Sequence, residues 1–274
     1  MAAAVLCTVA AGAQAQPCES DLPEAGVPVR APLAPANFGE QPEACGVTSI
    51  SLRGRLALLI AMDDYYGQMH AGVGLGGRLV LPGGSWLSAE LPGFDYRFAA
   101  NATIEAESMG LSASTVGYHV PVRLGDHLQL APYGRLMFPT ETVFDNALRY
   151  GVEHGISMVG NVAPWLEVMG GYSLPLALTT GAYGHSQSLF MPTVSLDIGL
   201  RPFTWFEGVG GLSMRVAPGE EEAFEGLDPR AALRFYPWRG SFIDVSGTFP
   251  LLGRDRTNAA VGVTLGVLFG TDGH

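Results

Sequence analysis

Residues 257–269, which read T-N-A-A-V-G-V-T-L-G-V-L-F, alternate between two kinds of side chain. One set is apolar throughout: Ala259, Val261, Val263, Leu265, Val267 and Phe269. The other set is mostly small or polar: Asn258, Ala260, Gly262, Thr264, Gly266 and Leu268. Successive side chains of a β-strand point to opposite faces, so this period of two predicts a strand with one apolar face. Any fold of this chain must cover that face with a core or place it in lipid.

The same alternation recurs from Val47 onward, in segments of roughly ten residues that are separated by turn residues. We count twelve such segments: 49–62, 68–81, 96–107, 109–122, 128–138, 147–158, 165–176, 188–200, 205–216, 231–236, 242–249 and 257–269. The alternation is weak around Ser114, where we expect a β-bulge. Pro192 requires another bulge, because proline cannot donate to a sheet ladder. Twelve is an even number, as barrels made from one bacterial chain require.

The connections between the segments differ in length in a regular way. If both chain ends lie in the periplasm, the periplasmic turns should be short and the outer loops long. The segments give short turns at 123–127, 159–164, 201–204 and 237–241, and longer loops at 139–146, 179–187, 217–228 and 251–256. Residues 82–94 break this rule, because their prolines and glycines predict a long loop on the periplasmic side.

Aromatic residues gather beside the short turns: Trp165, Phe203, Trp205, Phe206, Phe235, Tyr236, Trp238 and Phe242. An aromatic ring at a membrane surface lies half in lipid and half in water. These residues therefore predict an aromatic girdle at the inner membrane interface of a barrel.

The main alternative to a membrane barrel is a soluble β-sandwich, which also has alternating strands and frequent turns. The solvent-facing side of a sandwich is rich in Lys, Glu and Asp, whereas only 15% of this chain is charged and 47% is hydrophobic. Its polar faces hold Gly, Ser, Thr and Ala with single arginines or acids. No apolar run reaches the ~18–20 residues of a membrane helix. We therefore predict an all-β fold, a closed antiparallel up-and-down transmembrane β-barrel of about 12 strands.

From Val47 to Phe269 the chain thus resembles the bacterial outer-membrane β-barrel proteins, in architecture and not through a match to one family. The resemblance implies residence in the outer membrane, contact with outer-membrane lipids and insertion by the barrel-assembly machinery. That machinery recognises a terminal strand ending in an aromatic residue, for which Phe269 is the candidate. A net charge of −11 argues against nucleic acid as a partner, because binding it requires a basic surface.

The residues before the barrel predict export. Residues 1–15 are largely apolar and end in Ala13-Gln14-Ala15, the A-x-A pattern of signal-peptide cleavage, although a basic n-region is missing; the alternative is a disordered alanine-rich terminus. Residues 16–46 are proline-rich, and we expect a structureless periplasmic lead-in before a barrel of residues 47–274. Cys18 and Cys45 bracket the lead-in and can form a disulfide in an exported chain. A lipid anchor on Cys18 is the weaker alternative, because the preceding residues make a poor lipobox.

With the apolar faces outward, the polar faces bring charged side chains into the lumen of the barrel. The arginines expected there are Arg53, Arg55, Arg78, Arg97, Arg135, Arg149, Arg215 and Arg234. The acids expected there are Glu105, Glu153, Glu167, Asp197, Glu207 and Asp244. Opposite charges in a confined interior should pair. Two interpretations stay open: a narrow channel for small polar solutes or ions, or a structural barrel with a filled lumen.

Other functions receive less support from the sequence. An outer-membrane lipid hydrolase would need a Ser–His pair, and the local candidate at residues 184–188, G-H-S-Q-S, lacks an acid or amide partner. The acidic residues 220–225 could bind divalent cations or bridge lipopolysaccharide in an adhesive barrel, although most charge runs are simply solvated. The scattered histidines lack metal-ligand spacing, and no phosphate, zinc or dinucleotide motif is present. We therefore predict no catalytic residues and no cofactor.

Overall fold

The computed structural model describes residues 48–61, 66–100, 105–125, 127–140, 148–163, 165–180, 186–190, 192–216, 224–237, 241–253 and 258–270. The predicted signal peptide, the lead-in with Cys18 and Cys45, His185 and Trp238 lie outside these ranges. Regular structure within them consists of β-strands. None of the described residues forms a helix that is long and apolar enough to cross a membrane.

Alternation between inward and outward side chains shapes the long strands. In β7, for example, Tyr133 and Arg135 are 5% exposed, while Leu136 and Phe138 are 49% and 43% exposed. The elements are β1 (Ser49–Ala61), β2 (Tyr66–Val80), β3 (Trp86–Ala100), β4 (Glu105–Leu111), β5 (Ser114–His119), β6 (Val122–Leu124), β7 (Leu128–Phe138), β8 (Leu148–Ala163), β9 (Leu166–Thr180), β10 (Ser186–Phe190), β11 (Thr193–Phe203), β12 (Phe206–Val216), β13 (Phe224–Phe235), β14 (Ser241–Thr248), β15 (Leu252–Gly253) and β16 (Asn258–Gly270).

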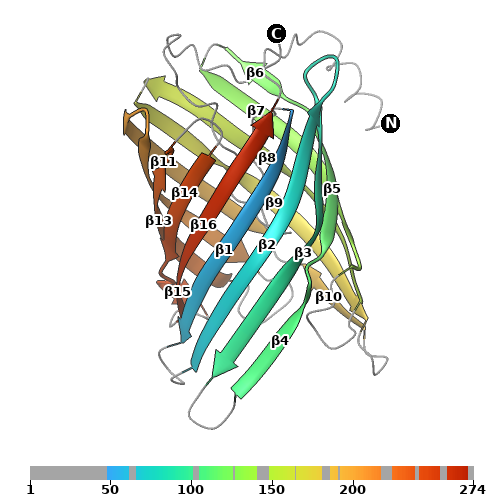
Figure 1. The fold of residues 1–274 in the computed structure, drawn as a ribbon. Coiled ribbons are helices and arrows are strands. Elements are labelled where there is room, and N and C mark those ends of the chain that lie inside the picture. Colours follow the sequence, from blue (N-terminus) through green and yellow to red (C-terminus); the bar gives the residue numbers. More distant parts are fainter. Residues whose placement is uncertain are drawn as a thin grey trace.

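These elements form one closed antiparallel sheet (Figure 1). β16 pairs with β1 from Ser49↔Gly270 to Ala61↔Asn258, so the sheet closes on itself and leaves no free edge in lipid. Three strands of the barrel are interrupted. The first consists of β4, β5 and β6, the second of β10 and β11, and the third of β14 and β15. Counted as single strands, they give the predicted barrel of 12 strands, which is confirmed.

The start of β1 and the end of β16 lie at the same end of the barrel, which we call the terminal end. The opposite end is called the loop end. The tight turns between β8 and β9 and between β11 and β12 lie at the terminal end. The connections predicted to be long join strands at the loop end.

The predicted loop at residues 82–94 is wrong. β3 begins at Trp86 and not near Tyr96, so the turn that follows β2 is short. Gly83 and Gly84 make this turn possible, because their φ angles of 93° and 82° lie in the left-handed region that other residues avoid. The turn is thus as tight as the others at the terminal end, and the exception to the length rule disappears.

Pro92 and Gly93, which suggested a loop, form a bulge inside β3 where its register with β2 shifts. Gly93 lies so close to β2 that a Cβ would collide with a backbone carbonyl there. Ser112 bonds the bulge from the other side: its N donates to Gly93 O at 2.8 Å, and its Oγ accepts from Gly93 N at 2.9 Å. The resulting interruption between β4 and β5 lies beside the bulge expected at Ser114.

Two further irregularities lie toward the loop end. Pro192 separates β10 from β11, and its carbonyl accepts a hydrogen bond from Val216 N at 3.0 Å. The expected bulge is absent there, because β10 and β11 keep the same register with β9 on both sides of Pro192. β13 begins at Phe224 and not at Ala231, so the loop predicted at residues 217–228 was too long. The acidic residues at the start of β13 concealed the strand, because they break the apolar alternation.

The outer face of the barrel is a belt of exposed apolar side chains. On β1, Leu52 and Leu56 are 48% and 46% exposed, whereas Arg53 between them is 6% exposed. On β16, Leu265 is 51% exposed and Thr264 is 7% exposed, as the alternation predicted. An apolar face outward and a polar face inward is the arrangement that a lipid bilayer requires.

The aromatic girdle is only partly as predicted. Phe203 and Trp205 are 56% and 54% exposed and stack with ring centroids 5.5 Å apart. Tyr236 and Phe242 instead face inward and are 6% and 2% exposed, so their assignment to the girdle was wrong. The physical reason is the alternation itself, because Tyr236 lies two residues beyond the inward-facing Arg234.

Candidate functional site in the barrel lumen

The inner wall of the barrel carries charged and aromatic side chains that are deeply buried. Trp86, His119, Glu153, Ser173 and Glu207 are each at most 2% exposed. Burying a charge is costly unless the group is paired and hydrogen-bonded. The geometry of the wall therefore follows from how its charges are satisfied.

Glu153 on β8 is the centre of the first network. Its Oε2 accepts from Arg135 Nη2 at 2.6 Å and Nε at 3.2 Å, and its Oε1 accepts from Tyr133 Oη at 2.9 Å and Ser173 Oγ at 2.8 Å. The donors come from β7 and β9, the two strands that pair with β8. The register of β7 with β8 places Arg135 directly opposite Glu153. Both carboxylate oxygens are thus satisfied, which offsets the lost hydration.

An aromatic stack adjoins this network at Tyr133. The His119 ring lies 4.9 Å from the Trp86 ring and 5.6 Å from the Tyr133 ring, measured between centroids. Ala131 and Val159 form a buried apolar cluster with Trp86. These side chains fill the part of the lumen next to β3, β5, β7 and β8.

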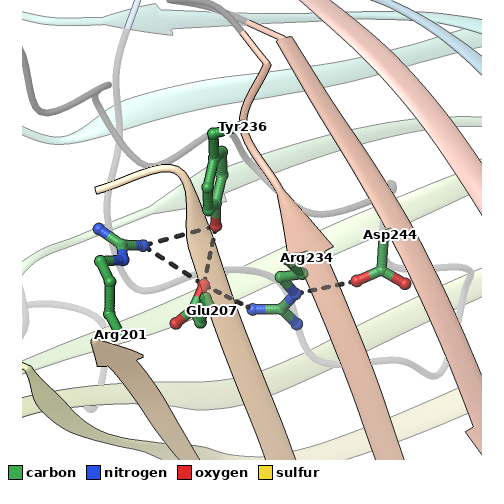
Figure 2. A network of polar contacts seen from close by, with 5 residues as sticks. All are labelled: Arg201, Glu207, Arg234, Tyr236 and Asp244. Atoms are coloured by element: carbon green, nitrogen blue, oxygen red, sulfur yellow. Dashed lines mark hydrogen bonds and ion pairs between the residues drawn. The ribbon is translucent and has the colours of Figure 1, made fainter. Parts of the chain in front are cut away.

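A second network crosses β11, β12, β13 and β14 (Figure 2). Glu207 Oε2 accepts from Tyr236 Oη at 2.7 Å and from Arg201 Nη2 at 3.3 Å, and Arg234 Nη1 lies 3.5 Å away. Arg234 also donates from Nε to Asp244 Oδ2 at 2.9 Å. The Arg201 guanidinium lies over the Tyr236 ring, with Cζ 5.2 Å from its centroid. Two arginines and two acids thus share one chain of contacts, so that the position of each depends on the others.

Two more ion pairs continue along these strands toward the loop end. Arg230 on β13 pairs with Asp197 on β11, and Arg215 Nε on β12 donates to Asp228 Oδ2 at 3.0 Å. The arginine is the more exposed member of each pair, 38% against 9% for the first and 31% against 11% for the second. The short acids therefore lie against the wall, and the longer arginines present more of their surface to the lumen.

The third group of charges lies on β1, β2 and β3. Arg53 forms an ion pair with Glu90. Arg97 donates to Asp95 Oδ2 from Nε at 3.0 Å and from Nη2 at 2.8 Å. Arg55 is exposed on the same inward side of β1 as Arg53, and within the described part of the chain it takes part in no hydrogen bond or ion pair.

Inward-facing glycines of the wall, such as Gly76 and Gly155, leave room for these side chains; we call these positions the glycine floor. A Cβ on Gly76 would meet the Glu90 carboxylate oxygens at 2.6 and 2.9 Å. A Cβ on Gly155 would meet Tyr133 Oη at 2.7 Å. Because glycine has no side chain, groups from the neighbouring strands can lie flat against the wall and need not cross the lumen.

The sequence-predicted lumen charges can now be placed. Those that take part in ion pairs on the inner wall are Arg53, Arg97, Arg135, Arg215, Arg234, Glu153, Asp197, Glu207 and Asp244. Arg55, Arg78 and Glu167 share the inward alternation of their strands, and Glu167 lies beside Glu207 above Gly199. The side chains of Glu105 and Arg149 lie outside the described part of the protein.

Sequence reasoning missed five inward charges: Glu90, Asp95, Arg201, Asp228 and Arg230. Each one is the ion-pair partner of a charge that was predicted. Glu90 and Asp228 lay in supposed loops, and Arg201 lay in a supposed turn. The signal that could have found them is the requirement for a countercharge, because a buried arginine or acid needs a partner from a nearby strand.

The inner wall also brings a serine and a histidine together, which the sequence did not predict. Ser88 Oγ and His119 Nε2 are 3.0 Å apart. Within the described residues, Nδ1 of His119 has no hydrogen-bond partner, and the Trp86 ring stacks on this histidine, which is 1% exposed. A catalytic serine needs a base held by a third group and access to substrate. This pair therefore packs the lumen.

The described residues contain no group of three or more His, Cys, Asp or Glu side chains that could hold a metal ion.

No protein-family model matches the chain, and no curated protein matches it. Solved structures do resemble it. An outer membrane channel from Pseudomonas putida F1 is 11% identical, with a TM-score of 0.61 over 86% of this chain and 100% of that chain. The KdgM porin in complex with disordered oligogalacturonate is 10% identical, with a TM-score of 0.51 over 80% of this chain and 99% of that chain. The translocator domain of the autotransporter NalP from Neisseria meningitidis is 10% identical, with a TM-score of 0.50 over 82% of this chain and 88% of that chain.

At these identities the likeness concerns the fold. The fold is that of a bacterial outer-membrane β-barrel, and a barrel with this apolar belt resides in the outer membrane.

Proposed function

We propose that the protein is a narrow outer-membrane channel for small polar solutes or ions. The observation that carries this proposal is the inner wall, where charged side chains retain contact with water. Arg55 is exposed, and Arg215 and Arg230 are 31% and 38% exposed. Polar, hydrated walls lower the cost of carrying a polar solute across a membrane. A barrel of 12 strands also lies between the filled eight-stranded barrels and the open sixteen-stranded porins.

The glycine floor supports the same proposal. Ion pairs such as Arg53–Glu90 lie against Gly76 and do not cross the lumen. A Cβ placed on Gly74, two residues away on the same face of β2, would meet no atom within 4 Å. Open space at the wall is what a channel needs and what a tightly packed interior lacks.

The second candidate is a structural barrel with a filled lumen. It is favoured by the burial of large inward side chains, since Trp86 and Phe242 are both 2% exposed and Tyr236 is 6% exposed. These rings narrow the lumen from two different parts of the wall. If they blocked it completely, the ion pairs would serve stability alone.

We propose no catalytic activity. The Ser88–His119 pair lies beneath Trp86 and lacks an acidic partner among the described residues. The other Ser–His candidate includes His185, which lies outside the described residues.

A liposome-swelling assay separates the two candidates. Liposomes that contain the folded protein should swell in isosmotic solutions of small polar solutes such as glycerol, and swelling should slow steeply as the solute becomes larger. Liposomes with heat-unfolded protein are the control. If wild-type protein gives no swelling but Trp86→Ala or Phe242→Ala does, the lumen is filled and the channel proposal fails.

A further inference from the structure

The ion pairs of the lumen present their two charges to water unequally. The arginine side chain is the more exposed member of Arg230–Asp197, at 38% against 9%, and of Arg215–Asp228, at 31% against 11%. The Arg201–Glu207 pair follows the same order, at 10% against 2%. The short acids are buried against the wall, so their charge is held away from the centre of the lumen.

One ion pair reverses this order, because Glu90 is 25% exposed and its partner Arg53 is 7% exposed. In the Arg97–Asp95 pair the exposures are nearly equal, at 20% and 18%, and Asp95 accepts two hydrogen bonds from Arg97. Every other acid in the ion pairs of the inner wall is at most 11% exposed.

Arg55 adds a positive charge that no described acid neutralises. It lies on β1 between Gly72 on β2 and Thr264 on β16, according to the register of the three strands. Its side chain is exposed and forms no ion pair or hydrogen bond within the described part of the barrel. Small neighbours on both sides leave this guanidinium in contact with water in the lumen.

We infer that the lumen favours anions, and that Arg55, Arg215 and Arg230 determine this preference. The inference rests on the proposed channel function and names its solute class: small anions, such as chloride, phosphate or short carboxylates. Guanidinium groups bind carboxylate and phosphate oxygens well, and rings of arginine or lysine select anions in other pores. The net charge of the whole chain is −11, so this preference runs against the overall charge of the protein.

Only charges close to the permeating ion matter for such a preference. At physiological ionic strength the Debye length is about 8 Å, so exposed charges outside the lumen are largely screened from an ion within it. Two unit charges a few ångströms apart in water still interact by an energy comparable with RT. The exposed guanidinium groups on the wall of a narrow lumen therefore act on the permeating ion more strongly than the acidic residues elsewhere in the chain.

Reversal potentials of the folded protein in planar bilayers under a KCl gradient test this inference. We expect wild-type protein to pass chloride more readily than potassium. Arg55→Gln should lower the chloride-to-potassium permeability ratio by about twofold or more, since one unit charge near the ion acts with an energy near RT. Arg55→Glu should lower the ratio further, and Arg55→Lys should restore it because the charge is retained.

A double variant distinguishes exposed charge from net charge. Arg230→Gln combined with Asp197→Asn removes one positive and one negative charge, so the net charge of the lumen is unchanged. Because Arg230 is the more exposed of the two, the chloride-to-potassium permeability ratio should fall. Glu107→Gln is the matched control, because Glu107 is exposed on the outward alternation of β4 and its loss should not change the ratio.

The outcomes separate this inference from the proposed function. Conductance that prefers potassium, or a chloride preference that is unchanged in Arg55→Glu and in the double variant, would overturn the inference and leave the channel intact. The absence of any conductance from inserted, folded protein would overturn both.

Discussion

Glu153 shows what a charged residue requires inside this barrel. It is 0% exposed, and both of its oxygens accept hydrogen bonds from neighbouring strands. A carboxylate with this burial is tolerated because three donors replace the water it loses. The same requirement explains why the inward charges occur in pairs, most of which join different strands; the exception is Arg97 with Asp95, both on β3.

Removing the Glu153 carboxylate should destabilise the folded barrel. Glu153→Ala deprives the Arg135 guanidinium, which is 5% exposed, of this partner, and breaking a buried ion pair costs roughly 3–5 kcal/mol. The free energy of unfolding can be measured by urea titration of the protein in liposomes. The double variant Arg135→Met/Glu153→Leu is the matched control and should recover most of the loss. Equal losses in the single and double variants would contradict this explanation.

A methyl group on the glycine floor should displace an ion pair. Gly76→Ala places a Cβ within 2.6 Å of a Glu90 oxygen, and overpacking of this kind costs roughly 1–3 kcal/mol. The displaced Arg53–Glu90 pair should also enter the lumen and lower the conductance. Gly74→Ala is the control on the same face of the same strand, and its stability should change by less than about 0.5 kcal/mol. If both substitutions have the same effect on urea titration, the floor has no special role.

Alternation alone could predict which charged side chains face inward, as for Arg53 and Glu207. Their partners could not, because Glu90 is 37 positions from Arg53 in the sequence and meets it only through the register of β1, β2 and β3. Register between strands is set by turns and bulges that single-strand patterns do not reveal.

At the scale of the strand, the sequence was most reliable where no bulge intervened. β1 and β7 begin and end within a residue of the expected positions, and neither shows a register shift with its neighbours. β3 was mislocated because Pro92 and Gly93 break the alternation within a continuous strand. Proline and glycine mark loops in most soluble folds, but in a barrel they also mark the bulges that let it close.

The lipid-facing side of a strand should not tolerate a charge near its middle. Ile198 lies near the middle of β11 and is 49% exposed on the outer face. Ile198→Arg should destabilise the inserted barrel by roughly 2–4 kcal/mol, whereas Phe203→Arg at the terminal end of β11 should cost about 0–1 kcal/mol. Urea titration in liposomes measures both. A larger cost at Phe203 than at Ile198 would mean that the apolar belt is not centred in the bilayer as proposed.

At the scale of the whole molecule, the closed circuit of strands follows from the repeated alternation. Each strand has one face for lipid and one for the lumen. Only a closed sheet gives the backbone N–H and C=O groups of every strand a hydrogen-bond partner, because an open sheet would leave edge strands unpaired in lipid. The fold class and strand number could therefore be predicted from the sequence. The free width of the lumen could not be predicted, because it depends on how far the inward-facing rings, such as Trp86 on β3 and Phe242 on β14, extend from the wall.

The distribution of charge is also a property of the whole barrel. The chain is acidic overall, yet the most exposed charges within its ion-paired lumen belong to arginines. Acids that lie against glycines on the wall hold these arginines in position. The proposed channel function therefore links permeation to stability, since the same ion pairs would serve both.

The central claim is that this outer-membrane barrel has a water-accessible lumen, and single-channel recording of the purified protein in planar bilayers tests it most directly. Heat-dependent migration on gels first establishes that the inserted protein is folded. We expect discrete conductance steps in KCl that become larger in Trp86→Ala, because removal of the indole, which is buried on the inner wall, widens the lumen. Folded, inserted protein that gives no conductance steps at any voltage would contradict the account.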